Sequence, residues 1–227
     1  MVTEKILTYN EWSRVMKKRN FISVIFIVMC LLPSMYAKEE ISEADAVYEK
    51  IRNQIQSGDV KADYKSLRLS CADSKYSCEE SRDVKNEIYK LLVDEKFIEA
   101  LKEIDKSLQK IFVDIELHYF AFIANVETDK KEKAEFHKTV IGGLLDSIQE
   151  DKNGRSEKDA FTVINTREIY VFLQFSGMNV HGQSLRNKDG HSYDVMTCTR
   201  EAGEEPFDVY FNVDIPMNSL SKLLGAD

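Results

Sequence analysis

The order of the hydrophobic patterns along the chain constrains its fold more than any other feature. From Ile41 to Gln149, apolar residues recur at spacings of three and four, as on one face of an amphipathic helix. From Ala160 to Val213, short β-prone runs and one helical run are separated by turn residues. Helices that precede strands, instead of alternating with them, indicate an α+β fold and not a doubly wound parallel sheet. We expect N-terminal antiparallel helical hairpins followed by a small C-terminal antiparallel β-sheet with one or two helices.

The helical part divides at recognisable stop and start signals. Ser57-Gly58-Asp59 ends the first helix, and Asp114 has the side chain of a helix N-cap. The stretch from 60 to 83 is mixed and polar. The expected helices cover 44–55, 84–93, 97–111, 115–126 and 131–149.

The segment from Leu91 to Leu101 is similar to the turn and second helix of a tetratricopeptide unit, where a small residue such as Ala100 lets two helices approach closely. Asp114 would open a second unit 31 residues after Asp83, near the roughly 34-residue period of that repeat. The similarity covers at most two units. An ordinary pair of helical hairpins without repeat ancestry accounts for the pattern equally well.

The C-terminal part has the composition of a small sheet. A capped helix from Thr166 ends at Gly177, and Pro216 can start a last short helix through Leu224. A further β-prone run covers 160–164. Three strands of an antiparallel meander are expected over 180–185, 192–199 and 207–213.

A secretory signal peptide is predicted near the N-terminus. The cationic residues 17–19 precede an apolar run from Phe21 to Leu32, and Ala37 offers a small residue before a cleavage site. This run has 12 residues, whereas a bilayer span needs roughly 20. We expect a bacterial protein exported to the periplasm or the extracellular space, with a mature chain from Lys38 and no membrane span after cleavage.

The upstream part leaves alternatives open. Met16 fits the start of the signal peptide better than Met1, which makes the preceding stretch a start-site artefact. A lipoprotein would use Cys30, and an uncleaved anchor would keep the apolar run in the membrane. The expected organisation is residues 1–37 as upstream stretch and signal peptide, 38–150 as a helical subdomain, and 151–227 as an α+β subdomain packed on it in one compact unit.

The charge of the mature chain argues against two classes of partner. Five of the 31 basic residues and two of the 39 acidic residues precede Lys38, so the remainder holds 26 basic and 37 acidic residues and a formal net charge of −11. No basic stripe is visible, so nucleic acid and anionic lipid are poor partners. Nothing in the sequence indicates an oligomeric state.

Three cysteines remain after cleavage. Cys71 and Cys78 can close a short disulfide loop in an oxidising compartment, and their spacing fits neither a zinc knuckle nor a thioredoxin-like motif. Cys198 lies in an apolar-alternating stretch and is expected to be a buried free thiol. An odd cysteine can also pair between molecules.

Four histidines supply the candidates for chemistry. His118 and His137 lie on helices expected to be adjacent, and a hydrolase or metal site would combine them with a carboxylate such as Glu168 or Asp194. No HExxH, GxSxG or SxxK motif is present. Packed, hydrogen-bonded histidines that support the fold are the alternative. We expect no cofactor and no metal.

A second set of polar residues surrounds the expected hairpin turn. Gln183, His191, Tyr193 and Asn212 could line a ligand-binding edge of the sheet. Turn chemistry plus one aromatic core residue is the alternative explanation.

An ordered series of short motifs resembles a family of secreted bacterial proteins known as a domain of unknown function (DUF4919-like). The resemblance spans most of the mature chain and departs at Lys152-Asn153-Gly154, where the family has Gly-Asp-Gly. It implies export and this architecture but no activity. The motifs are Asp63-Tyr64-x-x-Leu67-Arg68, Asp114-Ile115-x-x-His118-Tyr119-Phe120, Phe136-His137, Gly143-Leu144-Leu145-Asp146-Ser147-Ile148, Gln183-Ser184-Leu185, Asp189-Gly190-His191-Ser192-Tyr193-Asp194-Val195 and Val209-Tyr210-Phe211-Asn212-Val213.

Three functions remain in competition. The first is a non-enzymatic protein- or peptide-interaction module of the cell envelope, which would recognise its partner in a groove between the helical hairpins. The second is a hydrolase or metal-using enzyme, and the third is a purely structural envelope protein. The aromatic candidates for the groove are Tyr89, Phe112, Tyr119 and Phe122.

Overall fold

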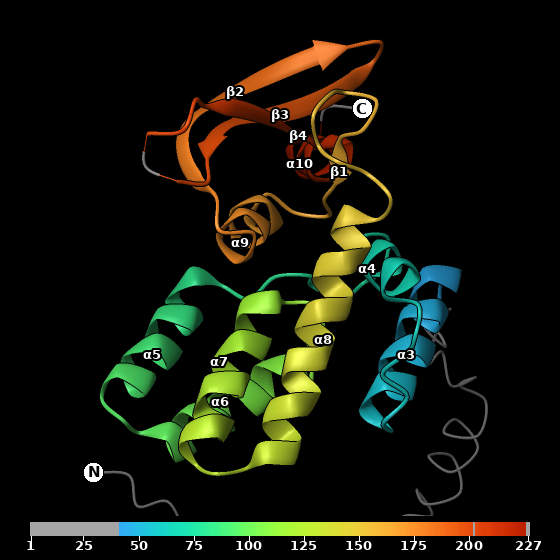
Figure 1. Cartoon of the computed structure of the whole chain (residues 1–227). Coiled ribbons are helices and arrows are strands. Elements are labelled where there is room, and N and C mark those ends of the chain that lie inside the picture. Colours follow the sequence, from blue (N-terminus) through green and yellow to red (C-terminus); the bar gives the residue numbers. More distant parts are fainter. Residues whose placement is uncertain (1–40, 202, 226–227) are drawn as a thin grey trace, which may run out of the picture. The chain divides into compact units, whose positions relative to one another are not determined.

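The computed structural model describes residues 41–201 and 203–225 of the chain (Figure 1). The predicted signal peptide, Cys30 and the upstream stretch lie outside these residues. The described part contains eight helices, six of which precede the sheet and one of which interrupts its strands. They are α3 (Glu43–Gln56), α4 (Tyr64–Ala72), α5 (Arg82–Val93), α6 (Phe97–Leu108), α7 (Ile115–Glu127), α8 (Lys131–Gln149), α9 (Arg167–Phe175) and α10 (Asp214–Leu224).

The N-terminal helices pack side by side (Figure 1). The α5/α6 hairpin contacts the α7/α8 hairpin through α6 and α7, and α4 joins α3 to α8. Four helices begin at a residue whose side chain accepts a hydrogen bond from the first turn, as N-caps do. These residues are Ser42, Asp63, Ser81 and Asp114.

Within the residues described, the sheet has four strands in the order β1-β4-β3-β2. They are β1 (Phe161–Thr162), β2 (Asn179–Lys188), β3 (His191–Thr199) and β4 (Phe207–Asn212). The expected meander of β2, β3 and β4 is antiparallel. The expectation of a wholly antiparallel sheet is wrong, because β1 pairs with β4 in parallel. The long connection through α9, β2 and β3 allows this, since parallel neighbours need a crossover and not a tight turn. The α+β class is confirmed.

One hydrophobic core joins helices and sheet. Residues from α3, α4 and α8 pack with residues from α9, β3 and β4, and a separate cluster lies between α5, α6 and α7. Among the residues that the structure describes, we find no helix with the length and hydropathy to cross a bilayer.

A buried ion pair connects the helical part to the sheet. The guanidinium of Arg68, which is 1% exposed, donates from Nε and Nη2 to the two carboxylate oxygens of Glu168 at 2.9 and 2.6 Å. It also donates to the carbonyl and hydroxyl oxygens of Ser147 and to the carbonyl oxygen of Thr162. These five bonds match the five N–H groups of a guanidinium. Arg68 thereby fixes α4, α8, β1 and α9 to one another.

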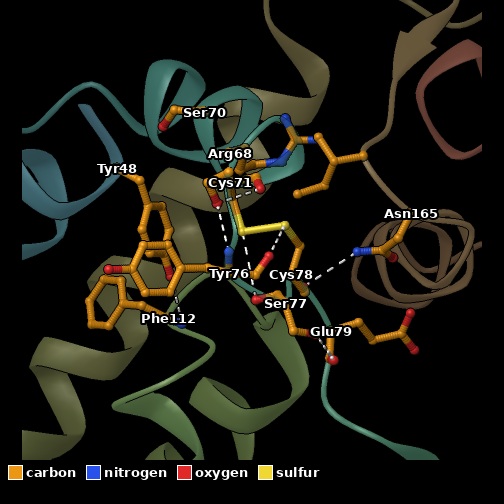
Figure 2. Close-up of a disulfide and its surroundings, with 12 residues drawn as sticks. Tyr48, Arg68, Ser70, Cys71, Tyr76, Ser77, Cys78, Glu79, Phe112 and Asn165 are labelled. Atoms are coloured by element: carbon orange, nitrogen blue, oxygen red, sulfur yellow. Dashed lines mark hydrogen bonds between the residues drawn. A yellow bond between two sulfur atoms is a disulfide. The ribbon is translucent and has the colours of Figure 1, made fainter. Parts of the chain in front are cut away.

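The disulfide lies at the end of α4 (Figure 2). Cys71 and Cys78 are bonded, and the carbonyl oxygen of Cys78 accepts a hydrogen bond from Asn165 at 3.5 Å, ahead of α9. Tyr48 and Tyr76 stack beside it, with ring centroids 4.9 Å apart. Closing so short a loop contributes roughly 2 kcal/mol in the chain-entropy picture. Cys198 is a free, buried thiol whose pKa is raised by burial.

Two adjacent glycines of α8 have opposite surroundings, which gives a matched test of the packing. A Cβ on Gly143 would overlap the ring of Tyr64 on α4, whereas a Cβ on Gly142 would meet nothing within 4 Å. We expect Gly143→Ala to lower the free energy of unfolding by about 1–3 kcal/mol through overpacking. Gly142→Ala should raise it by up to about 1 kcal/mol through helix propensity. Urea denaturation of both variants checks this, and equal effects would contradict the close contact between α4 and α8.

Candidate functional site

A cleft of about 300 Å³ opens between α5, α7 and α9, and we call it the α5–α7–α9 cleft. Each helix contributes residues spaced three or four apart, which therefore lie on one face of that helix. The lining residues are Glu79, Arg82, Lys85, Asn86, Tyr89, Glu116, Tyr119, Phe120, Arg167, Val171, Gln174 and Phe175.

One end of the cleft is a network of charges. The ammonium group of the buried Lys85 lies 2.9 Å from carboxylate oxygens of both Asp114 and Glu116, and 3.8 Å from Glu79. Arg167 donates two hydrogen bonds to Glu116, at 2.8 and 2.6 Å. Asp114 also caps α7 and accepts a bond from the backbone of residue 80. This network fixes α9 against α5 and α7.

Burial and neighbouring charges set the protonation of this network. Burial lowers the pKa of Lys85, but Asp114 and Glu116 outweigh it, so the pKa is raised. Burial raises the pKa of Glu116, but hydrogen bonds from Arg167 and Lys85 outweigh it, so that pKa is lowered. For Glu79, burial dominates and raises the pKa. Lys85 and Glu116 therefore remain charged at neutral pH.

The other end of the cleft is aromatic. Tyr89 faces Phe120 with ring centroids 6.4 Å apart, and Tyr119 meets Phe175 edge to face at 5.4 Å. Among the phenylalanine and tyrosine residues in the described part of the chain, three are exposed: Tyr89 at 59%, Tyr170 at 42% and Phe175 at 39%. All three lie on α5 or α9, and Tyr89 and Phe175 line the cleft.

Sequence reasoning identified only part of this wall. Tyr89 and Tyr119 line the cleft, but Phe112 is buried in the main core and Phe122 packs against it. The sequence did not predict that α9 lines the cleft. No local sequence pattern indicates that α9 lies beside α5 and α7. A larger hollow of about 550 Å³ lies between α5 and α6, but its lining has four lysines, four carboxylates and no aromatic residue.

His118 and His137 lie together in the interior. The Nε2–H of His118 donates to the carbonyl oxygen of Phe112 at 2.8 Å, so its Nδ1 accepts the Nδ1–H of His137 at 2.9 Å. His118 has no exposed surface and His137 is 8% exposed. Burial lowers the pKa of His118 to about 3 and that of His137 to about 4. Both rings are neutral at pH 7.

The two candidate carboxylates lie elsewhere. Glu168 binds Arg68, and Asp194 accepts a hydrogen bond from Gln183 at 3.0 Å. Neither contacts the histidine pair, so the His–carboxylate arrangement of a hydrolase is not formed by these residues. Within residues 41–201 and 203–225, no three His, Cys, Asp or Glu side chains are grouped to hold a metal ion.

One face of the sheet carries three members of the second candidate set, namely His191, Tyr193 and its strand partner Asn212. Gln183 is paired with Met196 and Tyr193 with Arg186, which places Gln183 and the buried Tyr193 on opposite faces of the sheet. His191 and Asn212 share the carboxylate of Asp214, at 2.6 and 2.9 Å. Sequence reasoning missed the His191–Asp214 pair because its members are 23 residues apart.

Comparison with known proteins gives one family. The family model described as "Domain of unknown function (DUF4919)" matches residues 35–222. No curated protein and no solved structure matches this chain.

Proposed function

Because this chain belongs to the family described as a domain of unknown function (DUF4919), whose description assigns no activity, we propose a function from the geometry of the chain itself. The protein is an exported, non-enzymatic module of the cell envelope that binds a protein or peptide segment. The recognition site is the α5–α7–α9 cleft.

The observation that carries this proposal is the position of the exposed aromatic residues. Aromatic side chains and arginine are enriched at the centres of protein interfaces, where they supply most of the binding energy. Tyr89 and Phe175 line the cleft from α5 and α9 and remain exposed, although most other Phe and Tyr rings of the described residues are wholly or partly buried. The volume, about 300 Å³, suits one or two inserted side chains.

The arrangement of the helices supports the same site. Stacked helical repeats form a concave surface that binds partners, and one helix of each hairpin lines it. Here α5 and α7 are the first helices of two successive hairpins, and α9 packs against α7. We infer that α9 closes the groove where a third hairpin would stand in a longer repeat array.

Export is the second element of the proposal. Residues 17–37 have the composition of a signal peptide, and a disulfide between Cys71 and Cys78 suits an oxidising compartment. In a Gram-negative host, we expect a mature N-terminus within a few residues of Lys38. N-terminal sequencing or intact mass of the exported form checks this. A periplasmic form that retains Met1 would contradict it.

Truncation of the cleft aromatics tests the recognition site. We expect Tyr89→Ala and Phe175→Ala each to weaken binding of a partner isolated from periplasmic extract by roughly tenfold, which is a typical loss for a hot-spot aromatic. The free energy of unfolding should change little for Tyr89→Ala, because Tyr89 is 59% exposed. For Phe175→Ala it should fall by roughly 1 kcal/mol, because the edge-to-face contact with Tyr119 is lost. Crosslinking pull-down followed by titration of the recovered partner gives the measurement.

Val93→Ala is the matched control. Val93 lies on α5, is 61% exposed and does not line the cleft. Its truncation should leave partner recovery unchanged. Loss of binding in the Val93 variant but not in the cleft variants would place recognition on another face of α5.

A further inference from the structure

The sheet ends in a strand with one unpaired edge. β2 is the outermost strand, and within the described residues its 10 residues pair only with β3. Alternate N–H and C=O groups of an antiparallel edge strand point away from its neighbour and can pair with another chain. We propose that this edge binds an extended segment of a partner protein as a fifth strand, and that the segment alternates apolar with acidic residues.

A β-bulge in β2 places two apolar side chains on the same face of the strand. The register with β3 shifts between Val180 and Gly182, so Val180 pairs with Cys198 and Leu185 with Asp194. Without the bulge, two residues five positions apart would lie on opposite faces. With it, both face the α9 side of the sheet, where they are 43% and 55% exposed. The hydroxyl group of Tyr170 on α9 donates to Gln183 at 2.9 Å, on the same side.

The opposite face of the edge carries positive charge. Arg186 and Lys188 pair with Tyr193 and His191 of β3, which places them on the other side of the strand from Leu185. Among the described residues, the acidic group that contacts them is Glu157, at 3.5 and 3.6 Å. Arg186 also donates a hydrogen bond to the hydroxyl group of Tyr210 at 2.8 Å. Two cations share one carboxylate there, in a chain of formal net charge −8. A strand with acidic residues at every second position complements this face.

The same charges argue against a second copy of this chain as the occupant. β2 contains no Asp or Glu, so a second β2 strand would offer no carboxylate to Arg186 or Lys188 in any register. Charged residues and bulges also protect edge strands from unselective pairing. The edge is therefore selective for an acidic strand.

This inference goes beyond the proposed cleft, because no residue of β2 lines the cleft. The test uses the exported form of the chain and the peptide acetyl-Thr-Val-Glu-Val-Glu-Val-Thr-amide. We expect the backbone amide NMR signals of residues 179–188 to shift on titration. Methylation of alternate backbone nitrogens of the peptide, or replacement of Glu by Lys, should weaken binding by roughly tenfold or more. Leu185→Asp should do the same, whereas Val93→Asp and Tyr89→Ala should not.

Three outcomes would overturn the proposal. The first is a dimer in sedimentation analysis that Leu185→Asp abolishes, because the occupant would then be a second copy. The second is shifts confined to α5, α7 and α9, which would support the cleft and refute the edge. The third is equal binding of the Glu and Lys peptides, which would show that the edge does not select an acidic strand.

Discussion

Replacing Arg68 with alanine is expected to lower the free energy of unfolding by about 3–5 kcal/mol, the usual cost of breaking a buried ion pair. The variant leaves the carboxylate of Glu168, which is 5% exposed, without its partner. It also leaves the carbonyl oxygens of residues 147 and 162 with fewer donors. Glu168→Ala should cost a similar amount, because the guanidinium would then be buried with an uncompensated charge. Chemical denaturation measures both.

Two controls separate this effect from a general loss of charge. Lys65→Ala removes an exposed ion pair of the same helix, with Glu150 at 3.2 Å, and should change the free energy of unfolding by less than about 1 kcal/mol. The double variant Arg68→Met/Glu168→Leu replaces the pair with apolar side chains and should recover much of the loss. A single variant as stable as the parent would show that the pair does not hold α4 to α9.

Acidification should destabilise the fold well above the pH at which carboxylates titrate. The pKa values of His118 and His137, about 3 and about 4, lie below the unfolded value of 6.5 because burial disfavours the charged ring. The unfolded chain therefore binds protons first. Their contribution to stability is fully present above pH 6.5 and is lost as the pH falls toward 4. Each histidine adds a slope of roughly 1.4 kcal/mol per pH unit within that window.

The pH range in which stability is lost distinguishes the contribution of the histidines from that of the acidic groups. The pKa values of Asp45, Glu116 and Asp214 are also lowered, from ordinary values of 3.8 to 4.5, so their contribution to stability is lost only at lower pH. Thermal unfolding between pH 7 and pH 5 measures the histidine part. His137→Gln keeps a donor for His118 and should reduce the slope by about half. A melting temperature that is constant over this range would refute the account.

The sequence predicted most helices because their apolar residues recur at helical spacing. Helix α4 was missed, since Arg68 occupies a core-facing position among Tyr64, Leu67 and Cys71. A pattern that counts arginine as surface cannot detect a helix whose buried face carries one. Its partner Glu168 lies 100 residues further along the chain, and no local rule connects such distant positions.

The sequence predicted the proximity of the two histidines but not their hydrogen bond. Successive helices of a hairpin pack together, so His118 on α7 and His137 on α8 were expected to be neighbours. Their direct hydrogen bond and complete burial depend on rotamers and on Phe112, which sequence spacing does not specify. In the same way, the sequence predicted cleft residues of α5 and α7 but not those of α9. Arg167 and Phe175 reach it through the path of α9 after the first strand.

The strand order also determines when the sheet can form during synthesis. β4 lies between β1 and β3, although its residues 207–212 are the last of the four strands to be translated. Among the described strands, β1 pairs only with β4, and the backbone N–H of Tyr210 donates to the carbonyl oxygen of Gly154 at 2.8 Å. Until β4 emerges, the meander is a two-stranded hairpin, which is marginally stable by itself. The α+β part therefore completes its fold only once the chain is nearly finished, while the earlier helical hairpins already have their local partners.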